Sequence, residues 1–310
     1  MAMSAPDRPW QPRLSLGPLP YFWPRQAVFD FYERMAQAPF DVVYLGETIC
    51  SKRRALRLED WLAIAAELTR AGKEVVLSTL TLIESESEVT HLKRVCANRR
   101  YWVEANDMGA VNLLVGSAFV AGPTINIYNS RTLARLAGAG AARWVLPTEL
   151  GRDTLTALQA ARPPGLQTEA LVHGRLPLSY SARCFTARAH NRAKDDCGFL
   201  CLEYSEGMPL ESREGEPFLV LNGIQTQSAL TYCLVGDLAD LRGHDIDVLR
   251  ISPQHQGTAE IAAVFRDAIA GTLKSPAAQH RLAALSPGGL CDGYWQGRAG
   301  MTQSLSKRAE

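Results

Sequence analysis

The chain has 310 residues, of which 33 are Lys or Arg and 32 are Asp or Glu, so its formal net charge is +1. This balance gives no electrostatic reason to expect a nucleic-acid partner or a charged membrane surface. No apolar run approaches the roughly 18 residues of a membrane span, and the N-terminus lacks the charged-then-apolar order of a secretion signal, which predicts a cytoplasmic protein.

Apolar runs suited to buried strands alternate with helical segments along most of the chain. Residues 41–46, DVVYLG, form a continuous apolar run bounded by a turn signal, as expected of a strand buried on both faces. The helical pattern of residues 58–72 follows this run and ends at a glycine. Further strand candidates lie at 13–19, 73–80, 101–107, 125–129, 143–150, 167–174, 218–224 and 245–252, with helical segments at 28–38, 86–100, 108–114, 130–140, 154–161 and 259–271.

Seven or eight β/α units of this kind predict a parallel sheet. In a chain of 310 residues they favour closure into a TIM-barrel-like (β/α) barrel, an α/β fold, over an open doubly wound sheet. We expect a disordered lead over residues 1–12, a single (β/α) barrel-like domain over 13–285 and a C-terminal tail over 286–310. The loops that follow the strands of such a barrel meet on one face, where functional sites are built.

Three of the seven cysteines lie close together in the sequence. Twelve residues separate Cys184 from Cys197, and three separate Cys197 from Cys201. If Cys197 and Cys201 share a helix, their i,i+4 relation directs both sulfurs to one face. Three thiolates are an incomplete ligand set for a tetrahedral metal ion or a cubane cluster, so a metal site here requires a fourth ligand.

Cys50 is the natural fourth ligand, because Cys50 and the segment of Cys184 both follow predicted strands and therefore face the same end of the barrel. The spacing alone leaves three interpretations open: structural zinc, an iron–sulfur cluster, or thiols that bind no metal. The remaining cysteines, Cys96, Cys233 and Cys291, are expected to pack as small buried residues.

Four polar residues at post-strand positions are candidate substrate contacts: Glu47, Arg53, Arg54 and His173. The two arginines suit an anion by bidentate contact, and they would also help to hold a net-negative cluster. His173 ends a predicted strand, where a histidine serves as a proton donor, as a partner of a bound substrate or as a structural residue. The sequence contains no P-loop, Rossmann fingerprint or G-x-S-x-G elbow, so those chemistries have no support.

The run EALVHGRLPLSYSARC, residues 169–184, resembles the signature of the collagenase-like peptidase family, in which a strand ending in His-Gly leads to a Ser-rich segment and cysteines. Many members have a cysteine three residues after the glycine, whereas this chain has Pro177, and Cys50 stands as the replacement ligand. DVLRISPQHQG, residues 247–257, occupies the place of a Lys-Ile-Glu-Gly-Arg-like segment of the peptidase-type members. We therefore do not expect peptidase activity.

The cysteine spacing and the tail CDGYWQGRAGM, residues 291–301, are similar to the ubiquinone-biosynthesis branch of that family. The resemblance implies a [4Fe–4S] cluster held by Cys50, Cys184, Cys197 and Cys201, and a UbiU-like partner protein in a heterodimer. It also implies oxygen-independent hydroxylation of the aromatic ring of a ubiquinone precursor. Two alternatives stay open: hydroxylation of RNA bases, which the near-neutral charge disfavours, and a non-catalytic subunit whose metal stabilises a partner surface.

Overall fold

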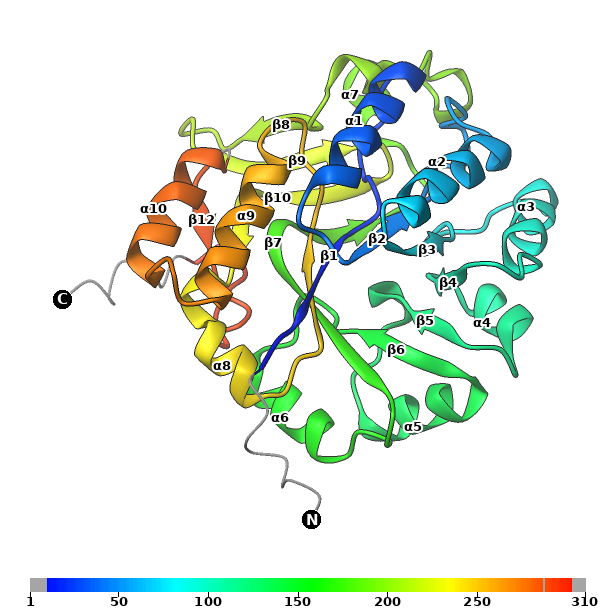
Figure 1. The fold of residues 1–310 in the computed structure, drawn as a ribbon. Coiled ribbons are helices and arrows are strands. Elements are labelled where there is room, and N and C mark those ends of the chain that lie inside the picture. Colours follow the sequence, from blue (N-terminus) through cyan, green and yellow to red (C-terminus); the bar gives the residue numbers. More distant parts are fainter. Residues whose placement is uncertain (1–9, 287, 303–310) are drawn as a thin grey trace.

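Eight parallel strands close into a barrel in the structure, a computed structural model that describes residues 10–286 and 288–302. They are β1 (Arg13–Leu16), β2 (Val42–Leu45), β3 (Glu74–Ser78), β4 (Trp102–Ala105), β5 (Phe119–Ala121), β6 (Ala141–Val145), β7 (Gln167–Tyr180) and β11 (Val248–Ile251). Each of β1 to β6 pairs with the next strand, and β11 pairs with both β1 and β7 (Figure 1). The TIM-barrel-like fold predicted from the sequence is confirmed.

Side chains of the strands alternate between the barrel interior and the surrounding helices. On β2, Val42 and Tyr44 belong to a small apolar cluster shared with the neighbouring strands, whereas Val43 and Leu45 belong to the large core under the helices. This period of two is what an extended backbone imposes, and it explains why the strand reads as one continuous apolar run.

Helices cover the outside of the barrel (Figure 1). On the first, Val28, Phe31, Tyr32 and Met35 are buried, which is the i, i+3, i+4, i+7 pattern of an amphipathic helix. The helices are α1 (Arg25–Gln37), α2 (Leu58–Arg70), α3 (Glu86–Cys96), α4 (Met108–Leu114), α5 (Ser130–Ala139), α6 (Arg152–Ala160), α7 (Phe185–Ala189), α8 (Leu238–Gly243), α9 (Thr258–Ile269) and α10 (Ser275–Leu285). Among the described residues, none of these helices has both the length and the apolar character needed to cross a membrane.

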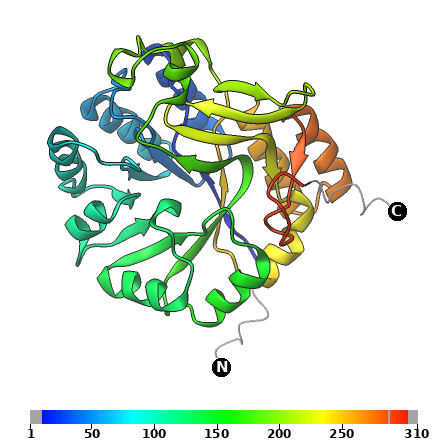
Figure 2. The same cartoon turned by 180° about the vertical axis from the view of Figure 1, so that it is seen from behind.

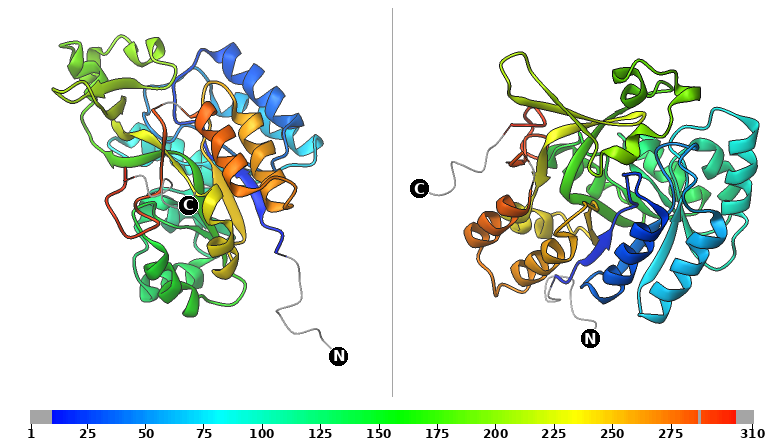
Figure 3. Two further views of the ribbon diagram at one scale, coloured as in Figure 1. Left: turned by 90° about the vertical axis from the view of Figure 1, so that its left-hand side faces the viewer. Right: turned by 90° about the horizontal axis from the view of Figure 1, so that it is seen from above.

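A long segment replaces the simple helical crossover between β7 and β11. It holds α7, the 3₁₀ turns η3 (Lys194–Asp196), η4 (Leu200–Glu203) and η5 (Val235–Asp237), the strands β8 (Met208–Glu211), β9 (Pro217–Asn222) and β10 (Gln225–Cys233), and α8. β10 runs antiparallel to both β7 and β9. Figures 2 and 3 show this inserted segment over the end of the barrel at which the parallel strands finish.

Two of the strand predictions are wrong: one segment forms a strand outside the barrel, and the other forms no strand. Residues 218–224 form an antiparallel hairpin strand instead of a barrel strand, because only Gly223 and Ile224 separate β9 from β10 and so short a connection cannot return a parallel strand. Residues 125–129 form no strand; Pro123 opens a 3₁₀ turn there, and left-handed Asn126 ends it. The fifth barrel strand is the shorter β5, which precedes them.

The segment predicted as a C-terminal tail contributes to the packed structure. The strand β12 (Leu290–Cys291) pairs parallel with β10, and Trp295 is buried beside His244, with ring centroids 5.8 Å apart. Residues 1–9 of the predicted lead and residues 287 and 303–310 of the predicted tail lie outside the described part of the chain.

A charged network occupies the barrel interior. Glu169 accepts hydrogen bonds from Ser15 Oγ and Arg250 Nε, both at 2.7 Å, and from the hydroxyl of Tyr44. Arg143 lies 3.7 Å from the same carboxylate and is fully buried. Burial alone would raise the pKa of Glu169, but Arg250 and Arg143 outweigh it and lower that pKa. The carboxylate is therefore ionised and is held between two cations.

The change Glu169→Gln should destabilise the protein strongly, because it removes the negative charge between two buried guanidinium groups. Breaking a buried ion pair from one side costs about 3–5 kcal/mol. Urea unfolding should show this loss, whereas the control Glu67→Gln, which breaks an exposed pair with Arg70 on α2, should change the free energy of unfolding by less than about 1 kcal/mol. Equal effects of the two changes would contradict this account of the barrel interior.

Candidate functional site

Two segments that are far apart in the sequence bring four cysteines to the same end of the barrel. Cys50 lies in the loop between β2 and α2, Cys184 is the N-cap of α7, Cys197 follows η3, and Cys201 lies within η4. All four are half-buried. Cys184 acts on the pKa of both Cys50 and Cys201, and Cys197 also acts on that of Cys201, so the thiols are close enough to interact electrostatically.

Cys197 and Cys201 do not share a helix. Gly198 and Phe199 stand between them with φ of 59° and 56°, and these two left-handed residues separate the turn η3 from the turn η4. A left-handed backbone is uncommon for a bulky residue such as phenylalanine. The Phe199 ring is 46% exposed and contacts that of Phe22, with centroids 6.0 Å apart. The i,i+4 argument therefore does not describe this segment.

Glu47 fixes the loop that carries Cys50. Its carboxylate accepts hydrogen bonds from the backbone N–H groups of Ile49, at 2.8 Å, and of Cys50, at 3.0 Å. The preceding Gly46 has φ of +137°, and a Cβ there would lie 2.5 Å from the carbonyl oxygen of Ser78. Only glycine meets both conditions without strain. The sequence LGE thus specifies the path of the chain toward Cys50.

Arg53 is buried at the centre of the cysteine region and connects the parts of the chain around it. Its Nη1 donates to the carbonyl oxygen of Pro20 and its Nη2 to Asn222 Oδ1, each at 2.7 Å, and its charge acts to lower the pKa of the Cys201 thiol. Gly223 makes room for it, since a Cβ there would lie 2.9 Å from Nη2. These contacts join three loops, so Arg53 is held by the protein and is not free to clamp a substrate as the sequence suggested.

Burial and nearby charge act on the pKa of the thiols in opposite directions. Burial raises the pKa of Cys50 and of Cys201, whereas Arg53 lowers both. Lys52 reaches across to the inserted segment, where its Nζ lies 2.7 Å from Asp195 Oδ1. The Nε of Arg53 is buried and has no hydrogen-bond partner among the described residues. Four sulfur donors beside a buried guanidinium with a donor to spare suit an anionic metal–thiolate group, because thiolates bind metals and cations stabilise them.

Over residues 10–286 and 288–302, no three His, Cys, Asp or Glu side chains are grouped closely enough to hold a single metal ion. A tetrahedral zinc ion would need sulfurs about 3.8 Å apart, given Zn–S bonds of about 2.3 Å. A four-iron cluster binds each cysteine at a different iron and so spans sulfurs that stand farther apart.

His173 lies away from the cysteine region. Between Arg250 and Ile251, which are consecutive on β11, the pairing on β7 moves by two residues, Val172 and His173, so β7 has a β-bulge there. The bulge shifts the alternation of side chains along β7. His173 is fully buried, with Nε2 at 3.2 Å from Ser286 Oγ and its ring 6.1 Å from that of Phe265 on α9. The strand pattern in the sequence carries no sign of this bulge.

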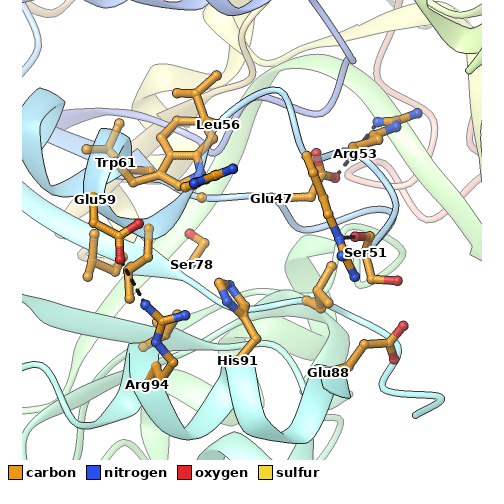
Figure 4. A pocket seen from close by; sticks show the side chains of 18 of the residues that line it. Glu47, Ser51, Arg53, Leu56, Glu59, Trp61, Ser78, Glu88, His91 and Arg94 are labelled. Atoms are coloured by element: carbon orange, nitrogen blue, oxygen red, sulfur yellow. Dashed lines mark hydrogen bonds and ion pairs between the residues drawn. The ribbon is translucent and has the colours of Figure 1, made fainter. Parts of the chain in front are cut away.

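A cavity of about 730 Å³ lies between α2 and α3, next to the loop of Cys50 (Figure 4). Glu47, Ser51 and Arg54 of that loop line it, together with Trp61 on α2 and His91 on α3. Of the four predicted substrate contacts, Glu47, Arg53 and Arg54 line this cavity, whereas the sequence did not single out Trp61 and His91. Trp61 and His91 lie in the first two turns of helices that follow neighbouring strands. That position was the signal from which the sequence could have predicted them.

Comparison with known proteins gives the family. A model of peptidase family U32 matches residues 29–304. The chain belongs to peptidase family U32. This agrees with the collagenase-like peptidase resemblance at the level of the family. Among solved structures, the U32 peptidase Mk0906 is 11% identical, with a TM-score of 0.44, over 81% of this chain and 96% of that one.

Other solved structures are similar to this U32 chain at a comparable level. Dihydrodipicolinate synthase from Agrobacterium tumefaciens str. C58 is 13% identical, with a TM-score of 0.34, over 84% of this chain and 76% of that one. The spore cortex-lytic enzyme SleL from Bacillus megaterium QM B1551 is 10% identical, with a TM-score of 0.40, over 83% and 74%. The barrel assignment does not rest on these similarities but on the strand pairing of the chain itself.

His173 should make the stability of this U32 protein pH-dependent. Burial lowers the pKa of His173 from 6.5 to about 3, so the folded state keeps a neutral ring where the unfolded state takes up a proton. Stability is therefore highest above pH 6.5 and falls as the pH drops from 6.5 toward 3, by about 1.4 kcal/mol per pH unit from this residue.

His173→Gln should remove that part of the slope. Urea unfolding at pH 7, 6 and 5 would measure it, and only the slopes are compared, since the substitution also alters packing. The control His280→Gln, at an exposed position on α10, should keep the slope of the unchanged protein. A slope that survives in His173→Gln would show that other groups cause it.

Proposed function

We propose that this U32 protein is a UbiV-like iron–sulfur protein. It would act with a UbiU-like partner, as a heterodimer, in the oxygen-independent hydroxylation of the aromatic ring of a ubiquinone precursor. The observation that carries the proposal is the gathering of Cys50 with Cys184, Cys197 and Cys201 at the finishing end of the barrel strands, around the buried guanidinium of Arg53. Functional sites of this fold are built at that end.

The four cysteines are the residues that would hold a [4Fe–4S] cluster. When bound, such a cluster would supply electron transfer; a hydroxylation without dioxygen also needs a separate oxygen donor, which the cluster does not provide. The thiols must lose their protons on binding. Burial raises the pKa of Cys50 and of Cys201, and the positive charge of Arg53 opposes that rise and so favours the thiolates.

Two other side chains position the ligands. Glu47 holds the backbone N–H of Cys50 and so fixes the direction of the first loop. Lys52 pairs with Asp195, and its Nζ also donates to the carbonyl oxygen of Lys194 at 3.1 Å. These contacts tie the loop of Cys50 to the turn before Cys197. The two cysteine segments are thus linked through the protein itself, which reduces the loss of conformational entropy when ligands are ordered around a metal.

The single change Cys→Ala at any of the four positions should lower bound iron and sulfide well below the roughly four of each per chain that a cubane requires. It should also abolish anaerobic hydroxylation by the two-chain complex. The measurement is iron, sulfide and zinc analysis with absorption spectra on protein purified and kept anaerobic. Cys96→Ala is the matched control, because Cys96 lies on α3 and interacts with none of the four thiols.

Three results would contradict the proposal. One zinc and no sulfide per chain would indicate a structural metal site. Hydroxylation retained in a cluster-free variant would remove the redox role of the cysteines. Tight RNA binding that weakens steeply with salt would favour action on RNA bases instead.

A further inference from the structure

The cavity between α2 and α3 supports an inference that goes beyond the cysteine cluster. Resting on the proposed function for the choice of ligand, we infer that this cavity is a binding site for a small planar carboxylate of the benzoate class, with its ring against Trp61 and its carboxylate at Arg54 and Arg57. The cavity is the space of about 730 Å³ shown in Figure 4, and it opens beside the loop that carries Cys50.

One wall of the cavity is apolar and presents an aromatic ring. Trp61 lines it from α2, with Leu56 and Leu80 as apolar neighbours. The Trp61 ring is half-buried and is held in place by Tyr32, which meets it edge-on with ring centroids 6.1 Å apart. A ring fixed on one side and open to a cavity on the other favours a flat, apolar or aromatic group.

The rim of the cavity carries two exposed arginines. Arg54 and Arg57 line it and are exposed, and neither takes part in an ion pair within the described residues. Arg54 donates from Nε to the carbonyl oxygen of Ser51 at 3.2 Å, which leaves its Nη groups available. Guanidinium groups bind carboxylates through two parallel hydrogen bonds. Two such groups beside an apolar wall suit a ligand that is both flat and anionic.

The acidic side chains that line the cavity are already engaged. Glu47 bonds two backbone N–H groups of the Cys50 loop, Glu59 pairs with Arg94 at 2.8 Å, and Glu88 accepts from the backbone N–H of Ser85 at 3.2 Å. Their negative charge is thereby partly compensated within the protein. The repulsion that an entering carboxylate meets is therefore reduced.

The charges that act on the pKa of His91 indicate the sign of the electrostatic potential in this part of the cavity. Figure 4 shows it rising from α3 into the space between Arg94 and Glu88. Burial lowers the pKa of His91, and the charges of Arg94 and Arg54 lower it further, against the opposing effect of Glu59. Among the charges that act on the pKa of His91, each of the two arginines thus has a larger effect than Glu59, and this balance favours an anion bound beside His91.

Calorimetric titration of the full-length protein with 4-hydroxybenzoate tests the inference. We expect saturable binding at one site per chain. Replacing the carboxylate by its neutral amide, in 4-hydroxybenzamide, should weaken binding by about 10-fold or more, since a charge-assisted bond is lost. Cyclohexanecarboxylate and inorganic phosphate keep the charge without the aromatic plane, and both should bind more weakly than 4-hydroxybenzoate. A 3-geranyl derivative of 4-hydroxybenzoate tests which kind of ligand the site takes. Tighter binding than that of 4-hydroxybenzoate indicates a prenylated precursor, and weaker binding indicates a free acid without a prenyl chain.

Matched variants locate the site. Arg54→Gln and Arg57→Gln should each weaken 4-hydroxybenzoate binding by about 10-fold, and Trp61→Leu should reduce the preference for 4-hydroxybenzoate over cyclohexanecarboxylate. Arg70→Gln is the control, because Arg70 is an exposed arginine at the far end of the same helix and does not line the cavity. Circular dichroism of each variant checks that the fold is kept.

The inference is overturned if 4-hydroxybenzoate does not bind saturably, if the amide binds equally well, or if the Arg54 and Arg57 variants behave as Arg70→Gln does. The titration also separates this inference from the proposed function. Cys184→Ala should bind 4-hydroxybenzoate as the unchanged protein does, because Cys184 does not line the cavity. A normal cluster without binding would defeat only the ligand site, and binding without a cluster would defeat only the proposed function.

Discussion

The carboxylate of Glu169 is the constraint on which the barrel depends. It lies in the interior with Arg250 and Arg143 on either side and with the hydroxyls of Ser15 and Tyr44 as further donors. Its partners come from β1, β2, β6 and β11, so one side chain of β7 connects strands on opposite sides of the barrel. An interior of this kind is stable only while every charge is paired, because an uncompensated buried charge is strongly unfavourable. The network therefore also selects the register in which the barrel closes.

Arg53 is a further buried cation, at the end of the barrel. Like Glu169, it connects parts of the chain that are distant in sequence. Its bonds to Pro20 and Asn222 join loops that follow β1 and β2 to the segment that follows β7. Arginine suits this role because its planar fork reaches several acceptors at once and keeps its charge when buried. The neighbouring Arg54 is exposed on the rim of the cavity between α2 and α3. Two adjacent arginines thus serve different purposes, one internal to the protein and one open to solvent.

The sequence predicted the barrel because most of its strands are short, apolar and followed by amphipathic helices, and 41–46 and 58–72 are clear examples. It misplaced elements where a local signal overrode the pattern, as at Pro123 and in the two-residue turn at Gly223. It identified the cysteines that come together, since post-strand loops share one face. It could not predict the partners of Arg53 or the setting of His173, because partners contributed by distant loops and a β-bulge leave no periodic trace in a single chain.

The inserted segment has a consequence for how this chain can change during evolution. Three of the four cysteines lie on it, yet β7 and β11 pair directly with each other, so the pairing that closes the barrel does not pass through it. The entropy of closing a flexible loop grows only with the logarithm of its length. Residues 188–219 of the segment, which include Cys197 and Cys201 and are not among the buried residues, can therefore be exchanged, lengthened or given new ligands without rebuilding the core. The loop of Cys50 has no such freedom, since Gly46, Glu47 and Arg53 fix its path; it is the inherited half of a site whose other half is free to diversify.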